Sequence, residues 1–139
     1  MLLNKNNITE IIPQQHPFVM VDNLLKANEE GFESTFIVDE NNIFFSKNNL
    51  QEPALIENIA QTVAAGFGYI DKQSGGKPKI GFIGSIAKLK LHSLPKSGDL
   101  IDTKVIHLHQ FENIYLVKGE SYANGTLLVE CEMKIVVQQ

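Results

Sequence analysis

The chain has 139 residues, of which 43% are hydrophobic, and its formal net charge is −4. This length predicts a single domain, 1–139, with a real core. The acidic balance, without a basic cluster, argues against nucleic acid and anionic membrane surfaces as partners. We find no signal-peptide pattern, no apolar run long enough to cross a bilayer, and one cysteine, Cys131, so we expect a cytoplasmic protein.

The first segment predicts little regular structure. Residues Asn7–Ile12 are typical of one helical turn that Pro13 closes. The two prolines of Pro13–Pro17 restrict the backbone, so we expect that stretch to be extended. The apolar run Phe18–Leu25 then predicts a strand covered on both faces.

A second strand is predicted at Phe32–Val38, where apolar and polar residues alternate, and it should pair back on the first as a hairpin. Residues Asp39–Glu52 show no clear periodicity. The apolar run Ile43–Phe45 within this polar loop is expected to close one end of the core.

The only long helical pattern runs from Pro53 to Ile70. Proline suits a first helical turn because its missing N–H would have no partner there. Apolar residues recur at three- and four-residue steps, at Ile56, Ile59, Ala60, Val63, Phe67 and Ile70. Strands are predicted on both sides of this helix. The fold class is therefore α+β, with one long helix packed on an antiparallel sheet.

Four further strands follow the helix. Glycines inside the first of them, Lys79–Leu91, indicate a bulge or a close approach at Gly81 or Gly84. The dipeptide Asn124-Gly125 is a strong hairpin signal between the last two strands. Such a sheet has two free edges, which natural proteins usually cover or pair. A homodimer is the expected way to pair them.

Glu57 and Gln61 are the polar residues of interest on the helix. They are four residues apart, so one lies above the other beside the apolar stripe. A carboxylate there should be half-buried, which favours its protonated form. Two simpler interpretations remain open: negative charge is welcome near any helix N-terminus, and Gln61 could serve only a neighbouring backbone group.

Histidines are candidates for a base or a metal site. His16, held between prolines, is a candidate base, with a surface or packing role as the alternative. His107 and His109 should share one strand face by alternation. No third ligand has suitable spacing, so we expect an exposed face and no metal.

The order of elements resembles the hotdog fold, and three motifs resemble the 3-hydroxyacyl-ACP dehydratases of the FabA/FabZ-like group. Ile12–Asp22 resembles their opening motif, and Leu55–Gln61 resembles their helix motif, whose glutamate is catalytic. Phe82–Ile86 and Pro95–Asp99 resemble the strand and turn that follow. The resemblance covers almost the whole chain.

The chain departs from this family at two places. In the family, a histidine in the loop before the helix serves as the catalytic base. The corresponding loop of this chain, Ser46–Pro53, is shorter and contains no histidine. The histidine of the opening motif is replaced by Gln14. These features resemble the short-loop branch found with aryl polyene and flexirubin synthases, whose members can work with a second dehydratase-like subunit.

The resemblance implies binding of an acyl chain carried on the phosphopantetheine of ACP or CoA, with no other cofactor. Glu57 would be the acid, N–H groups near Ala54 and Leu55 would hold the thioester carbonyl, and His16 would be the substitute base. The acyl chain would lie between helix and sheet, at a dimer interface. The remaining substrate-binding candidates are Phe45, Gln61 and Gly84.

Two other functions stay open. The chain could be a non-catalytic subunit that binds acyl-ACP or scaffolds an active dehydratase, which the missing histidine favours. It could also be a thioesterase in which Glu57 activates water. Expected partners are ACP and either a second copy or another dehydratase-like subunit.

Overall fold

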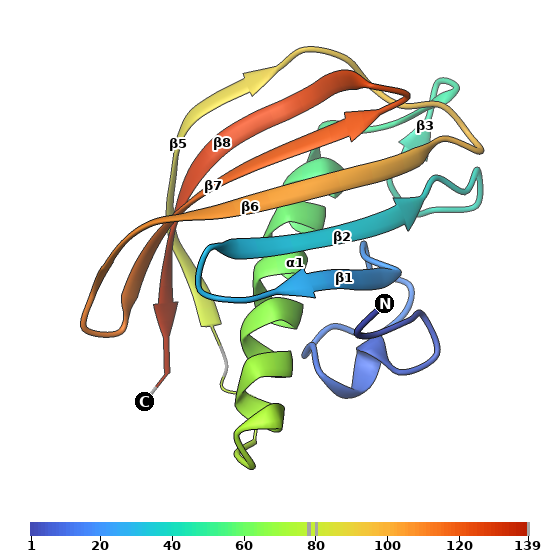
Figure 1. Ribbon diagram of the computed structural model, residues 1–139. Coiled ribbons are helices and arrows are strands. Elements are labelled where there is room, and N and C mark those ends of the chain that lie inside the picture. Colours follow the sequence, from blue (N-terminus) through green and yellow to red (C-terminus); the bar gives the residue numbers. More distant parts are fainter. Residues whose placement is uncertain (78, 80, 139) are drawn as a thin grey trace.

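The computed structural model describes residues 1–77, 79 and 81–138. Six strands form one antiparallel sheet in the order β1-β2-β6-β7-β8-β5, and β3 and β4 form a small separate hairpin (Figure 1). The elements, in chain order, are η1 (Ile8–Glu10), β1 (Asn23–Ala27), β2 (Gly31–Ile37), β3 (Phe45–Ser46), β4 (Asn49–Leu50), α1 (Glu52–Gln73), β5 (Gly81–Leu91), β6 (Leu100–Phe111), β7 (Ile114–Ala123) and β8 (Thr126–Val137).

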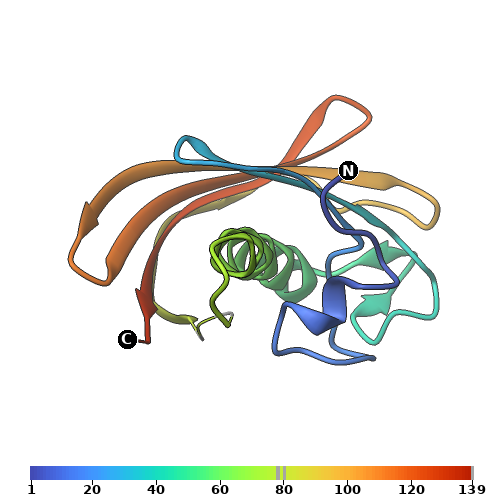
Figure 2. The same cartoon turned by 60° about the horizontal axis from the view of Figure 1, so that its bottom comes forward.

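The sheet curves around α1, which lies in its concave side (Figure 2). The N-terminal segment lies along the same helix, next to the part of the sheet that contains β1. This is the hotdog architecture expected from the sequence, with one long helix wrapped by an antiparallel sheet. Within the described ranges, no helix combines the length and apolarity that a bilayer crossing requires.

The helix is buried on more than its predicted apolar stripe. Ile59 and Val63 are in the main core against the sheet, as expected. A second cluster, centred on Ala65, packs against apolar residues of the N-terminal segment and β1. Because two layers cover α1, polar residues of the helix are fully buried as well, namely Asn58, Gln61 and Thr62.

Two glycines allow α1 to approach the sheet closely. A Cβ atom at Gly66 would lie 2.2 Å from Cδ1 of the buried Phe32 ring, and one at Gly119 would lie 2.4 Å from Cγ2 of Ile59. Real side chains never approach that closely, so the helix–sheet contact depends on these positions having no side chain.

The segment before β1 differs from its prediction. Only the end of Phe18–Leu25 is strand, because β1 begins at Asn23. The backbone of Met20 pairs with side chains of α1 instead of with a neighbouring strand. Pro13–Pro17 is not extended throughout either, since the N–H of Phe18 donates to the Gln15 carbonyl and closes a turn.

The C-terminal half matches its predictions closely. The register between β5 and β8 shifts around Gly84, which is the bulge that the strand glycines indicated. Asn124 and Gly125 both have positive φ, 53° and 77°, as a tight hairpin between β7 and β8 requires.

The apolar run in the loop before α1 behaves as predicted in part: Phe44 and Phe45 pack on the core, while Ile43 is exposed.

The edge strand β5 is exposed along its whole length. Its partner β8 covers one side only, so the other backbone edge of β5 is unpaired within the described part of the chain. The exposed side chains include several large apolar residues, namely Phe82, Ile83, Ile86, Leu89 and Leu91. An edge that is long and apolar is a surface on which another strand can pair.

The close approach at Gly66 can be tested by Gly66→Ala. Alanine favours an isolated helix by about 1 kcal/mol over glycine. Here the methyl group would strike Phe32, and overpacking of this kind costs about 1–3 kcal/mol. We therefore expect the free energy of unfolding in urea to fall by up to about 2 kcal/mol. Gly76→Ala is the control, because its Cβ would meet only the Asp71 carbonyl at 3.4 Å. Equal effects of the two changes would contradict the packing account.

Candidate functional site

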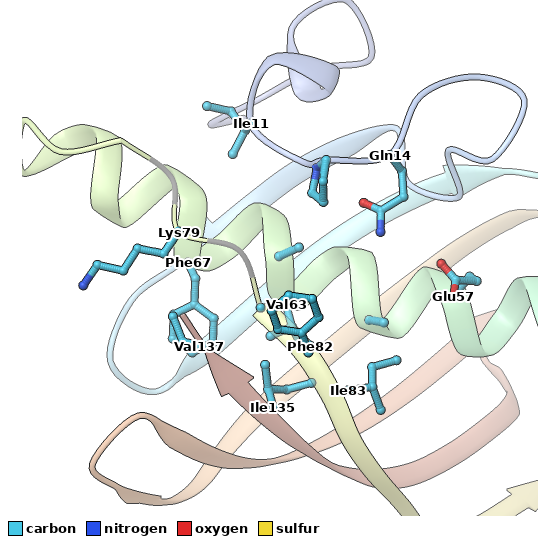
Figure 3. Close-up of a pocket in the computed structure, with 14 residues that line it drawn as sticks. Ile11, Gln14, Glu57, Val63, Phe67, Lys79, Phe82, Ile83, Ile135 and Val137 are labelled. Atoms are coloured by element: carbon cyan, nitrogen blue, oxygen red, sulfur yellow. The ribbon is translucent and has the colours of Figure 1, made fainter. Parts of the chain in front are cut away.

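A cavity of about 250 Å³ lies between α1, the N-terminal segment and the paired strands β5 and β8 (Figure 3). Its wall is mostly apolar, with few polar side chains, as is usual for sites that bind small organic ligands. The lining residues are Ile11, Pro13, Gln14, Glu57, Ala60, Val63, Ala64, Phe67, Lys79, Gly81, Phe82, Ile83, Ile135 and Val137.

Glu57 supplies the carboxylate of this cavity. It is half-buried and lies in the second turn of α1, which begins at Glu52. Gln61 is fully buried one turn later and donates from Nε2 to Oε2 of Glu57 over 3.0 Å. The predicted pairing of these two side chains is therefore present, and the carboxylate is fixed in direction on the cavity wall.

Gln61 also fixes the backbone of the N-terminal segment. Its Nε2 donates to the Phe18 carbonyl over 2.9 Å, and its Oε1 accepts from the Met20 N–H over 2.6 Å. The interpretation that Gln61 serves backbone groups is thus also correct. One amide joins Glu57 to the segment that forms the opposite wall of the cavity.

Asn58 is a second buried amide, which the sequence analysis did not single out. Its Nδ2 donates to the Met20 carbonyl over 2.7 Å, and its Oδ1 accepts from the Thr103 hydroxyl on β6. Thr103 in turn pairs with Ser121 of β7 over 3.0 Å. On the helix itself, Thr62 donates to the Asn58 carbonyl over 2.7 Å. The signal available in the sequence was the spacing of Asn58 and Thr62, four residues apart beside Ile59.

Asp22 completes the attachment of this segment. Its carboxylate accepts the N–H of Ile37, at the end of β2, over 2.8 Å. Burial raises the pKa of Asp22 above its ordinary value, and the hydrogen bond from Ile37 offsets part of that effect. Asp22 ends the opening motif, and in this structure it ties that motif to the sheet.

The family of the chain follows from comparison with known proteins. The family model for ApeP-like proteins, described as ApeP dehydratase, matches residues 6–139. The chain belongs to the ApeP-like dehydratase family. Among curated proteins it is similar to the 3-hydroxyacyl-[acyl-carrier-protein] dehydratase FabZ of Campylobacter jejuni, with 26% identity over 145 residues and 98% of each chain covered.

Solved structures show the same fold. The ApeP-like chain is similar to a chain of the dehydratase heterocomplex ApeI:P from Xenorhabdus doucetiae, with a TM-score of 0.86, 17% identity, and 95% and 91% of the two chains covered. It is also similar to a hypothetical thioesterase with coenzyme A from Streptococcus pneumoniae, with a TM-score of 0.68, 13% identity and 84% of each chain covered. At these identities the likeness establishes the hotdog fold alone.

Several other predicted site residues of this ApeP-like protein lie outside the cavity wall. His16 is exposed in the turn after Gln15. Ala54 and Leu55 are fully buried, and the Ala54 N–H already donates to the Gln51 carbonyl over 3.1 Å. Phe45 packs on the core from the short β3–β4 hairpin.

Gly84 is exposed at the β5 bulge and does not line the cavity either. Its neighbours Phe82 and Ile83 line it instead. β5 therefore does form part of the cavity wall, as expected, but with the side chains of Phe82 and Ile83 and not at Gly84.

The prediction for the strand histidines is wrong in part, although His109 is exposed as expected. A register shift between His107 and His109 breaks the alternation, so the two side chains do not share a face. His107 is half-buried, with its ring 4.8 Å from that of Phe32 and 5.7 Å from that of Phe67. Its Nδ1 donates to the Glu29 carbonyl over 2.8 Å. Because Phe67 also lines the cavity, this aromatic cluster supports one end of the site.

The buried amide network can be tested by Asn58→Leu. This change leaves the Met20 carbonyl without its buried partner, while the Thr103 hydroxyl loses one hydrogen bond and keeps Ser121. An unsatisfied buried carbonyl costs about 1–3 kcal/mol and the lost hydrogen bond of Thr103 about 1 kcal/mol, so we expect the free energy of unfolding in urea to fall by about 2–4 kcal/mol. Asn41→Leu, at an exposed loop position, is the matched control and should change it by less than about 0.5 kcal/mol. A similar small effect for both variants would show that the network does not hold the segment.

Proposed function

We propose that this ApeP-like protein binds a 3-hydroxyacyl chain, carried on the phosphopantetheine of an acyl carrier protein, in the cavity between α1 and β5. We further propose that Glu57 is its catalytic acid. The observation that carries this proposal is a half-buried carboxylate, held by Gln61, on the wall of an otherwise mostly apolar cavity. The matched family, described as ApeP dehydratase, supports the same reaction class.

The chemistry assigned to Glu57 is protonation of the leaving group. In dehydration a base removes a proton from C2, the C2–C3 double bond forms, and the C3–O bond breaks. The oxygen leaves as water when an acid protonates it. A carboxylic acid on the cavity wall suits that step, because it can give its proton directly to the leaving oxygen.

The base is not evident in this chain. Within the described residues no histidine lines the cavity, and His16 is exposed outside it. A second copy of the chain would bring the same short loop, Ser46–Pro53, which has no histidine. A dehydratase-like partner that retains the loop histidine would supply the missing group.

The exposed edge of β5 is where we place that partner. Phe82 and Ile83 lie on this edge strand and also line the cavity, so a subunit paired with β5 would lie against the site. The similar chain from Xenorhabdus doucetiae belongs to a heterocomplex of dehydratases. A hetero-oligomer therefore accounts for both the apolar edge and the missing base better than a homodimer does.

A second candidate function is that of a non-catalytic subunit. The absence of a histidine from the cavity wall of the described residues favours it. In that case the chain would bind acyl-ACP, or stabilise an active dehydratase, without Glu57 taking part in the reaction. The structural likeness to a hypothetical thioesterase adds hydrolysis as a weaker third candidate.

Glu57→Gln separates the first two candidates. We expect the purified chain, together with the dehydratase-like subunit that co-purifies with it, to dehydrate 3-hydroxyacyl-ACP, as followed by mass spectrometry. Loss of a positioned acid costs about 10²–10⁴-fold, so the variant complex should lose turnover by that factor. Glu52→Gln is the matched control, because Glu52 is on the same helix but not on the cavity wall. Full turnover by the Glu57→Gln complex would assign the chain to the non-catalytic role.

A further inference from the structure

We infer that Gln14 binds the 3-hydroxyl group of the substrate and makes the cavity selective for 3-hydroxyacyl chains over acyl chains that lack a hydroxyl. This inference rests on the proposed function, since it takes the cavity to be the acyl site. Gln14 lines the same cavity as Glu57, from the opposite wall. Figure 3 shows its amide extending from the N-terminal segment toward the helix face that carries Glu57.

The Gln14 amide has no evident structural task. Its Oε1 is covered by the protein, yet it accepts no hydrogen bond from the described residues. An unpaired buried acceptor destabilises a fold, which is why almost all such atoms have partners. The other two glutamines of this region follow that rule: Gln15 donates to the Thr9 carbonyl, and Gln61 makes three hydrogen bonds. Because Oε1 is covered, the part of the amide that a ligand in the cavity can reach is Nε2, which points toward the helix in Figure 3.

The position of Gln14 is fixed by its surroundings. Pro13 precedes it and restricts the backbone. The segment is anchored on one side by the buried Ile11 and Ile12, and on the other by the bonds of Gln61 to Phe18 and Met20. A backbone held in this way keeps the side chain on the cavity wall, so no backbone freedom is lost when a ligand binds it.

A hydroxyl group matches this amide whichever way the amide is turned. It can accept from Nε2, or donate to Oε1 after the amide rotates, because a hydroxyl both donates and accepts. A carbon chain without the hydroxyl leaves the amide unpaired in an apolar site. An enzyme site built to pair a hydroxyl rejects the analogue that lacks it for this reason.

The same contact would orient the leaving oxygen. With Gln14 on one wall and Glu57 on the other, the hydroxyl lies between an amide that holds it and a carboxyl that protonates it. Gln14 itself exchanges no proton. It is a binding and positioning residue. This role would explain why glutamine stands where the opening motif of the family has histidine.

Selectivity between two unreactive ligands tests the inference. The probes are thioether analogues of 3-hydroxydecanoyl-pantetheine and decanoyl-pantetheine, and their Kd values for the full-length chain are measured by calorimetry. We expect Gln14→Leu to reduce the preference for the hydroxylated probe about tenfold, which corresponds to one hydrogen bond, and to keep affinity for the other probe. The control Gln15→Leu changes the exposed neighbouring residue and should leave the preference intact.

Thermal unfolding without ligand separates binding from structure. Because Gln14→Leu removes an unpaired acceptor, the Tm should be equal or higher, whereas a structural glutamine would lower it. Gln14→Met, which keeps the length of the side chain, is used if the leucine variant fails to fold. An unchanged preference, or equal weakening of both probes with a lower Tm, would overturn the role of Gln14 alone. If the wild type binds neither probe, the acyl site is wrong and this inference falls with it.

Discussion

Two buried amides on one helix face hold the N-terminal segment of this structure against α1. Asn58 and Gln61 both pair with the backbone of Met20, and Gln61 reaches Phe18 and Glu57 as well. Without these bonds the N-terminal segment would leave backbone groups buried and unpaired, which is costly. The segment therefore does not pair as a strand at this point but follows the side chains of α1. That attachment builds the cavity, because one wall is helix and the opposite wall is the segment.

The attachment of the N-terminal segment to α1 brings the proposed functional side chains into one cavity. It sets Glu57 and Gln14 on facing walls of one apolar cavity, and β5 closes the third side. The third side is also the exposed, apolar edge of the sheet. The site of a single chain is thus next to the surface where a partner strand would pair. The proposed dehydratase-like subunit would account both for the missing base and for the edge of β5 that no described strand pairs.

Local patterns predicted the parts of the fold that local forces determine. The long helix, the bulge around Gly84 and the Asn124-Gly125 hairpin all follow from spacing or from backbone preferences within a few residues. The pairing of Glu57 with Gln61 follows from helical geometry alone. The motifs also indicated the family, because several of them occur in a shared order along the chain.

Long-range contacts decided the rest. Met20 pairs with a residue 41 positions away and another 38 positions away, so its departure from strand geometry has no local signal. His107 continues the inward alternation of β6, and a register shift after it, which alternation cannot reveal, separates His109 from that face. Gln14 was noted only as a departure from the family pattern, and its place on the cavity wall, with an Oε1 that no described residue pairs, became visible with the fold.

The most direct test of this account is a crystal structure of the chain with its dehydratase-like subunit and an unreactive 3-hydroxyacyl-pantetheine thioether. The account predicts that the acyl chain lies between α1 and β5, with its hydroxyl oxygen within about 3.2 Å of the Glu57 carboxyl group. An acyl chain bound elsewhere on the protein, or one whose hydroxyl group points away from Glu57, would contradict it.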